Sequence, residues 1–203
     1  KFRQRDSVND SFEMAWTNAQ LELRFLNIPP AATLAFQELA SHLLYPNPLL
    51  RSAAQRIADN RNGQAGLWAY AISGDLPIAL VAIAEARDLG LVRQMLQAHT
   101  YWRMHGLVAD LVILNEEASG YAQPLREELE HLIQSHGANT EVDRPGGIYL
   151  RSAYLIPAED LTLLRAVASV VLVAARGTLP QQLAASALEA PSLPKPMARK
   201  RDL

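Results

Sequence analysis

Short runs of consecutive apolar residues alternate with helical patterns in the second half of the chain. The predicted strands are residues 78–83, 110–115, 147–151 and 170–174, and the helices predicted between them are residues 88–105, 121–136 and 157–169. The runs are continuous instead of alternating, which is typical of strands buried on both faces of a parallel sheet. The pattern therefore predicts an α/β fold with about four mostly parallel strands and right-handed crossover helices.

The first sixty residues follow the helical period instead. An amphipathic helix is predicted over about residues 10–27, and its apolar positions recur every three or four residues: Phe12, Trp16, Ala19, Leu23 and Leu26. Two prolines follow, and further helices are predicted before residue 46 and over residues 49–58. We expect these helices to form an N-terminal annex that packs on the α/β layer.

Changes in composition divide the chain into four parts. Residues 1–60 are the N-terminal helices, and residues 61–77 are a glycine-containing loop with a short extended piece. Residues 78–183 are the α/β layer, and residues 184–203, rich in proline, alanine and basic side chains, are predicted to be a linker.

Composition narrows the function classes. The 203 residues include no cysteine, which excludes disulfide scaffolds, cysteine-based zinc sites and thiol nucleophiles. With 19 basic and 21 acidic side chains, the formal charge of −2 argues against a general nucleic-acid binder. No apolar run approaches the length of about 18 residues that a membrane span needs. The chain does not begin with methionine, and we expect it to be part of a longer polypeptide.

Sequence motifs indicate neither a catalytic centre nor a cofactor or metal site. No strand-to-helix junction carries a glycine-rich phosphate-binding motif, and no G-x-S-x-G elbow is present. Glu116 and Glu117 are adjacent and would point apart, so they do not make an acid–nucleophile pair. His99 is in phase with the buried helix face, which favours a core histidine over a metal ligand.

The predicted strand ends offer one candidate binding site. Ligands of open parallel sheets bind outside the carboxyl ends of the strands, where Asn115, Glu116 and Arg176 are expected. These side chains could bind sugar hydroxyls, and Trp68 could stack against a sugar ring. The alternative is that the polar residues only solvate the rim of the sheet, as in every α/β protein, and that Trp68 anchors its loop on the core.

Four collinear stretches are distinctive: residues 15–24 (AWTNAQLELR), 62–78 (NGQAGLWAYAISGDLPI), 98–116 and 143–148 (DRPGGI). They resemble the bacterial cyclic β-1,2-glucan synthases, and the resemblance covers most of residues 12–183. Ala71 stands where glycine is expected in the family. The resemblance implies a parent membrane glycosyltransferase with a C-terminal region similar to cellobiose phosphorylases. This chain would be the α/β piece between β-sandwich units of that region.

The resemblance transfers no catalytic residue. The Asp-x-Asp and Gln-x-x-Arg-Trp motifs of the family's transfer step are absent, and the helical barrel that carries the phosphorolysis-type acid is absent too. It implies neighbouring sandwich and helical-barrel domains as partners, in a soluble domain on the cytoplasmic side of an inner-membrane protein. We therefore expect a non-catalytic accessory or spacer domain. The alternatives are a β-1,2-glucan-binding module that uses the strand-end rim, and an independent small enzyme of the doubly wound class.

Overall fold

A single parallel sheet organises the part of the chain that the computed structural model describes, which is residues 5–25, 28–118, 123–136 and 142–188. The strand order is β3-β2-β1-β4, and all neighbouring strands are parallel. The strands are β1 (Ile78–Ile83), β2 (Asp110–Asn115), β3 (Ile148–Ser152) and β4 (Val170–Val173). The predicted α/β fold with four parallel strands and preceding helices is confirmed.

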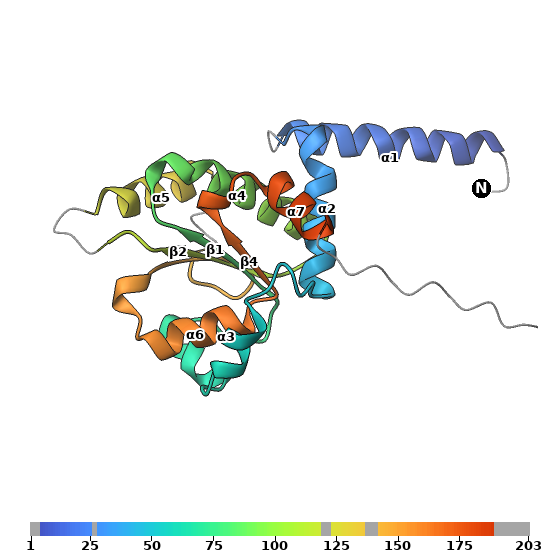
Figure 1. The fold of residues 1–203 in the computed structure, drawn as a ribbon. Coiled ribbons are helices and arrows are strands. Elements are labelled where there is room, and N and C mark those ends of the chain that lie inside the picture. Colours follow the sequence, from blue (N-terminus) through green and yellow to red (C-terminus); the bar gives the residue numbers. More distant parts are fainter. Residues whose placement is uncertain (1–4, 26–27, 119–122, 137–141, 189–203) are drawn as a thin grey trace, which may run out of the picture.

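Helices cover both faces of the sheet (Figure 1). One face lies under α2 (Pro30–Leu44), α4 (Leu89–Met104), α5 (Pro124–Ser135) and α7 (Leu179–Leu188). The other face lies against α3 (Ala54–Asp59), α6 (Ala158–Val167) and the 3-10 helix η1 (Gln64–Tyr70). Short 3-10 turns η2 (Ala86–Asp88), η4 (Ala153–Leu155) and η5 (Ala174–Arg176) follow the carboxyl ends of β1, β3 and β4.

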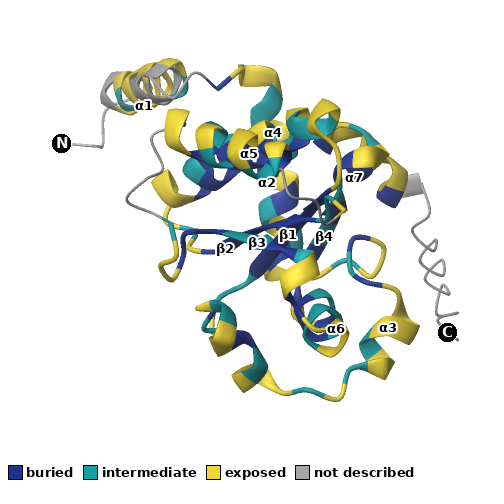
Figure 2. Ribbon diagram, turned by 90° about the vertical axis from the view of Figure 1, so that its left-hand side faces the viewer, coloured by how far each residue is buried: buried dark blue, intermediate teal, exposed yellow. Residues whose placement is uncertain are grey.

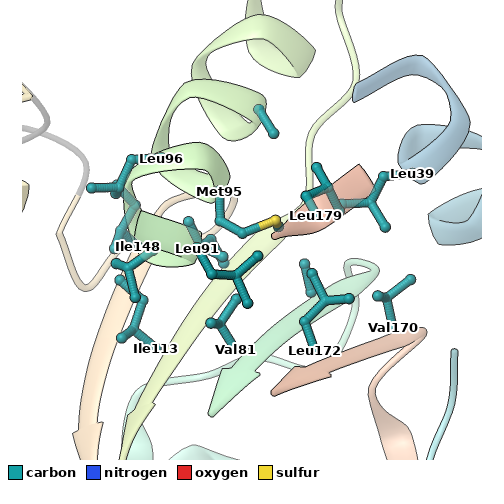
Figure 3. Packing of buried hydrophobic residues seen from close by; sticks show 14 of the residues in the cluster. Leu39, Val81, Leu91, Met95, Leu96, Ile113, Ile148, Val170, Leu172 and Leu179 are labelled. Atoms are coloured by element: carbon teal, nitrogen blue, oxygen red, sulfur yellow. The ribbon is translucent and has the colours of Figure 1, made fainter. Parts of the chain in front are cut away.

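Alternate strand residues divide the core into two clusters, because successive side chains of a strand point to opposite faces. On the α4 side, Val81, Ile113 and Leu172 pack against Met95 and Leu96 (Figure 3). On the α6 side, Leu80 and Val112 belong to a second cluster with Leu67 of η1 and Leu163 of α6. The two central strands, β1 and β2, are buried along their whole length between the helical layers, which explains their continuous apolar sequence (Figure 2).

The N-terminal helices differ in how they meet this layer. Phe36, Leu39 and Leu43 of α2 are buried, and Trp102 of α4 donates its indole hydrogen to the Phe36 carbonyl at 2.8 Å. In contrast, α1 (Arg5–Phe25) extends beyond the body in Figure 1, and its Phe12 and Trp16 are exposed. The expectation that the annex packs on the α/β layer therefore describes α2 and not the outer part of α1.

Local differences from the predicted elements have identifiable causes. The third helix begins at Ala54 instead of Leu49, because Leu50 is buried beside β4 and its carbonyl accepts the Val171 N–H at 2.6 Å. The expected loop over residues 61–77 contains η1 in place of an extended piece. Residues 184–188, assigned to the linker, continue α7, and residues 189–203 lie outside the described chain. The described helices include none long and apolar enough to cross a membrane.

Candidate functional site

Asn115 lies at the carboxyl end of β2, as predicted, but its side chain forms a hydrogen bond with the chain's own backbone. It is only 3% exposed, and its Oδ1 accepts the N–H of Glu117 at 2.8 Å. An asparagine that closes a turn two residues onward is a common way to end a strand. Its oxygen is therefore used inside the fold.

Glu116 turns to the α6 side of the sheet and forms an ion pair with Arg165. Its backbone N–H donates to the Ile83 carbonyl at 2.7 Å, which extends the pairing of β2 with β1. Sequence reasoning missed Arg165, because nothing in the pattern shows which charge on α6 faces the end of β2. The pair joins α6 to the carboxyl end of the sheet.

Arg176 and Trp68 are the two candidates that remain exposed. Arg176 ends η5 and makes no ion pair with the residues that the structure describes. Trp68 is 64% exposed in η1, on the α6 side, and donates its indole hydrogen to the Ser73 carbonyl at 3.3 Å. No hydrogen bond joins Trp68 or Arg176 to Asn115 or Glu116 in the described chain. The four side chains do not form one converging set, and sugar binding by them stays a prediction.

A shallow crevice of about 220 Å³ lies outside the carboxyl ends of β1 and β4. In the sheet, β2 lies on one side of β1 and β4 lies on the other, so the crevice is at the point where the strand order reverses. Open parallel sheets commonly bind ligands at such a point. Arg87, Gly90, Gln94, Gly177 and Thr178 are among its lining residues. Gln94 is already engaged, since its Oε1 accepts the backbone N–H of Leu179 at 2.9 Å.

The opposite, amino-terminal end of the sheet contains the most deeply buried polar groups. His99 of α4 is 2% exposed, and its Nε2 lies 3.2 Å from the Ala109 carbonyl and 3.1 Å from the Gly146 carbonyl. Both partners are acceptors, so Nε2 carries the hydrogen. Burial lowers the pKa of His99 to about 4, although these carbonyls favour the charged form. The predicted core histidine is thus a link between α4 and two backbone segments.

Asp110 completes this arrangement from the first position of β2. Its Oδ1 accepts the Gly146 N–H at 2.7 Å, and burial raises the pKa of the carboxyl group. Its Oδ2 and the hydroxyl of Tyr149 on β3 are both buried, and neither has a hydrogen-bond partner within the described parts of the chain. Burial, followed by the charge of Asp110, raises the pKa of Tyr149 to about 12. We refer to His99, Asp110 and Gly146 as the amino-end lock.

The amino-end lock has titratable groups but not the geometry of a catalytic pair. His99 and Asp110 each bond to the backbone of the Gly146 turn, and no hydrogen bond joins them to each other. Gly146 has φ +73°, and a Cβ there would overlap Val108 Cγ1. Among the described residues, no three His, Asp or Glu side chains gather closely enough to hold a metal ion. The lock therefore fixes a turn.

No protein-family model matches the chain. A comparison with curated proteins found the cyclic beta-(1,2)-glucan synthase NdvB of Rhizobium meliloti (strain 1021), 34% identical over 185 residues. The match covers 91% of this chain and 6% of the relative. The chain is similar to one segment of a glucan synthase. The resemblance predicted from the sequence is thereby confirmed, while the chain spans only a small part of that relative's length.

Three of the four stretches that carried the resemblance contribute to the amino-end lock. Residues 98–116 supply His99 and Asp110, and residues 143–148 supply Gly146. Residues 62–78 include Pro77, whose carbonyl accepts the Asp110 N–H at 2.9 Å. These stretches of the glucan-synthase-like sequence are therefore used to close one end of the sheet.

The stretch over residues 62–78 is held by a second polar network on the α6 side. Asp160 of α6 accepts hydrogen bonds from the Tyr70 hydroxyl at 2.7 Å and from the Asn62 side chain at 3.0 Å. Arg151 of β3 donates twice to the Tyr70 carbonyl, at 2.6 and 3.1 Å. Asp160 also lies in the first turn of α6, where an acidic side chain favours the helix dipole. Its partners are distant in sequence, and only the tertiary structure shows them.

Proposed function

We propose that this chain is an accessory, non-catalytic α/β domain of a glucan-synthase polypeptide, which holds the neighbouring modules in register. The similarity of nearly the whole chain to 6% of the length of NdvB carries the proposal. The non-catalytic role is supported by the bonds that the polar side chains make within the chain itself. Asn115, Glu116, His99 and Asp110 all engage the chain's own backbone or side chains.

The partners in this proposal are the other modules of the same polypeptide. We place sandwich and helical-barrel units on either side of the domain and assign it to the cytoplasmic side of the membrane. The exposed apolar residues support contacts of this kind, since large apolar surfaces on one protein usually mark contacts with another surface.

Two measurements test the proposal. The purified 203-residue chain should release no glucose 1-phosphate from β-1,2-glucan in phosphate buffer, and it should extend no glucan chain. Release of glucose 1-phosphate by the chain alone would contradict a non-catalytic role. An antibody to the chain should detect a much longer polypeptide in its source cells, and a native product no longer than this chain would remove the spacer role.

A glucan-binding module is the alternative, and the exposure of Trp68 and Arg176 favours it, since Arg176 has no ion-pair partner among the residues that the structure describes. Titration of β-1,2-glucan into the chain, followed by tryptophan fluorescence, separates the two functions. A spacer gives no change at millimolar sugar. A binding module gives a saturable change that disappears in Trp68→Phe and weakens in Arg176→Ala, whereas Trp16→Phe, on α1, leaves it intact.

A further inference from the structure

Two neighbouring strands each carry a buried polar side chain with an atom that has no hydrogen-bond partner in the described chain. These atoms are Oδ2 of Asp110, at the start of β2, and the hydroxyl of Tyr149, in β3. Both side chains are 0% exposed. A buried polar group that lacks a partner costs free energy, and native folds satisfy nearly all such groups. Each of these two atoms therefore needs a partner.

The strand register places the two side chains on the same face of the sheet. Val112 of β2 lies beside Tyr149 of β3, so Asp110, two residues before Val112, is a diagonal neighbour of Tyr149. Val112 and Tyr149 both belong to the core cluster on the α6 side, and Asp110 points to that side because alternate strand residues share a face. Strand spacing and rise put diagonal Cα atoms roughly 8 Å apart, which is within reach of an aromatic side chain.

The two groups are chemically complementary. A carboxylate oxygen accepts hydrogen bonds, and a phenol hydroxyl can donate one. Burial, and next the charge of Asp110, raise the pKa of Tyr149, so the carboxylate acts on this hydroxyl. The other buried side-chain atoms without a partner in the described chain are Arg51 Nε and Ser52 Oγ. They follow Leu50, whose carbonyl bonds to β4 at the opposite edge of the sheet, so they do not serve this pair.

We propose that one buried water molecule bridges Asp110 Oδ2 and the Tyr149 hydroxyl. The two oxygens are not in direct hydrogen-bond contact. A single water with hydrogen bonds of about 2.8 Å on each side spans a separation of up to roughly 5.5 Å. It accepts a hydrogen bond from Tyr149 and donates one to Asp110, and buried waters typically bind such otherwise unsatisfied groups.

The bridge extends the amino-end lock to β3. Asp110 then uses both carboxylate oxygens: Oδ1 accepts the Gly146 N–H at 2.7 Å, and Oδ2 reaches Tyr149 through the water. One side chain of β2 thus fixes the turn before β3 and a residue within β3. The water is a structural ligand of the fold and is independent of the proposed spacer function.

A crystal structure of the native 203-residue chain, at a resolution that shows ordered water, tests the proposal directly. It should show one water within hydrogen-bond distance of both Asp110 Oδ2 and the Tyr149 hydroxyl. A direct hydrogen bond between the two side chains, a metal ion between them, or no ordered molecule at this place would each overturn the proposal.

Tyr149→Phe provides a test in solution. Without the hydroxyl, the water loses a partner and Asp110 loses a donor, so the pKa of Asp110, measured by carbon NMR of its carboxyl group, should rise further. The charges of Asp75, Asp143 and Arg151, which also act on this pair, are the same in every variant.

Tyr45→Phe is the matched control, because it removes a hydroxyl from a tyrosine that is 80% exposed, and it should leave the pKa of Asp110 unchanged. An unchanged pKa in Tyr149→Phe, or a water that stays in the crystal structure of this variant, would contradict the bridge. If Tyr149→Phe does not fold, the native crystal structure still decides. Neither experiment involves glucan or turnover, so the bridge and the spacer role can fail separately.

Discussion

The two ends of the sheet use their polar residues in different ways. At the carboxyl end, Asn115 caps a turn, Glu116 pairs with Arg165 on one face, and Arg176 lies exposed after η5. At the amino end, His99 and Asp110 come from different elements and meet at one turn. The carboxyl end is where α/β folds commonly bind ligands, yet of the two sets compared here the side chains that converge on one turn are at the amino end.

This difference shows what the glucan-synthase-like motifs do in this segment. A buried polar group without a partner costs free energy, so a buried cluster of bonded side chains specifies one arrangement of the backbone. The amino-end lock is such a cluster, whereas of the candidate rim residues Asn115 is buried, Glu116 is partly exposed, and Arg176 and Trp68 are exposed. We therefore expect substitutions at the amino end to change stability and those at the carboxyl end to change it little.

The largest effect is expected for Gly146→Ala. Its left-handed φ of +73° and the overlap with Val108 act together, and the free energy of unfolding should fall by roughly 2–5 kcal/mol. Urea unfolding followed by circular dichroism measures the loss. The control is Gly90→Ala at the carboxyl end, where a Cβ meets nothing within 4 Å, so a helical alanine should raise stability. Equal losses at both glycines would remove the distinction between the ends.

The pH dependence of stability should reveal His99. Its pKa is lowered to about 4 in the folded chain from the ordinary 6.5, so the unfolded chain binds the proton more tightly. Stability is full above pH 6.5 and falls as the pH drops toward 4, by about 3 kcal/mol for this group.

The difference between the unfolding curves of the native chain and His99→Gln at each pH isolates this contribution. The subtraction matters because the raised pKa of Asp110 acts in the opposite direction, destabilising the fold as the pH rises. If the native chain and His99→Gln lose stability in parallel between pH 6.5 and 4, then His99 is not held neutral by burial.

Asp110→Ala should cost about 1–3 kcal/mol, because it leaves the Gly146 N–H without its acceptor. Asp110→Asn keeps a carbonyl oxygen at the same place and should lose clearly less. Hydrogen exchange at the Gly146 amide gives an independent readout, since this amide should exchange faster in Asp110→Ala. Equal stability of the two variants would mean that the acceptor does not matter.

Ala71→Gly should stabilise the chain. Ala71 has φ 59° at the end of η1, a left-handed conformation that costs a residue with a Cβ about 1–2 kcal/mol. Glycine also gains entropy in the unfolded state, so the net increase should be smaller, roughly 0.5–1 kcal/mol. Thermal unfolding measures it, and Ala69→Gly, within η1, is the control that should destabilise. A lower midpoint for Ala71→Gly would contradict the strained turn.

The smallest effect is expected at the carboxyl end, for the Glu116–Arg165 pair. Both side chains are partly exposed, so solvent weakens the interaction, and Glu116→Gln should cost at most about 1 kcal/mol. A double-mutant cycle with Arg165→Met measures the coupling between them. A coupling free energy as large as the stability lost in Asp110→Ala would show that side-chain contacts stabilise the carboxyl end of the sheet as strongly as the amino end.

The strands and the helices between them could be predicted from the sequence because their signals are local. The apolar run 110–115 coincides with β2 (Asp110–Asn115), and burial on both faces follows from its continuity. The candidate rim residues were predicted near the strand ends for the same reason. The directions of these side chains could not be predicted from the sequence. Whether Glu116 faces α6 depends on the strand register, and its partner Arg165 lies 49 residues away in the chain.

The amphipathic pattern of α1 was also visible in the sequence, but its surroundings were not. Residues Phe12 and Trp16 have the same spacing as the buried residues of α2, and no local signal distinguishes the two helices. The same holds for His99, whose phase predicted burial but whose two carbonyl partners come from separate segments.

The sequence by itself determined the fold class, the position of the parallel strands and the resemblance to a glucan synthase. These follow from periodicity and from residue identity, which are properties of the chain read in order. Only the tertiary structure decided that the stretches resembling glucan synthases meet at the amino end of the sheet, that the rim residues diverge, and that Phe12 and Trp16 of α1 are exposed. Contacts between distant segments depend on how the layers pack. The pattern along the sequence indicates which residues share a face of a helix or strand, but not which residues pack against that face.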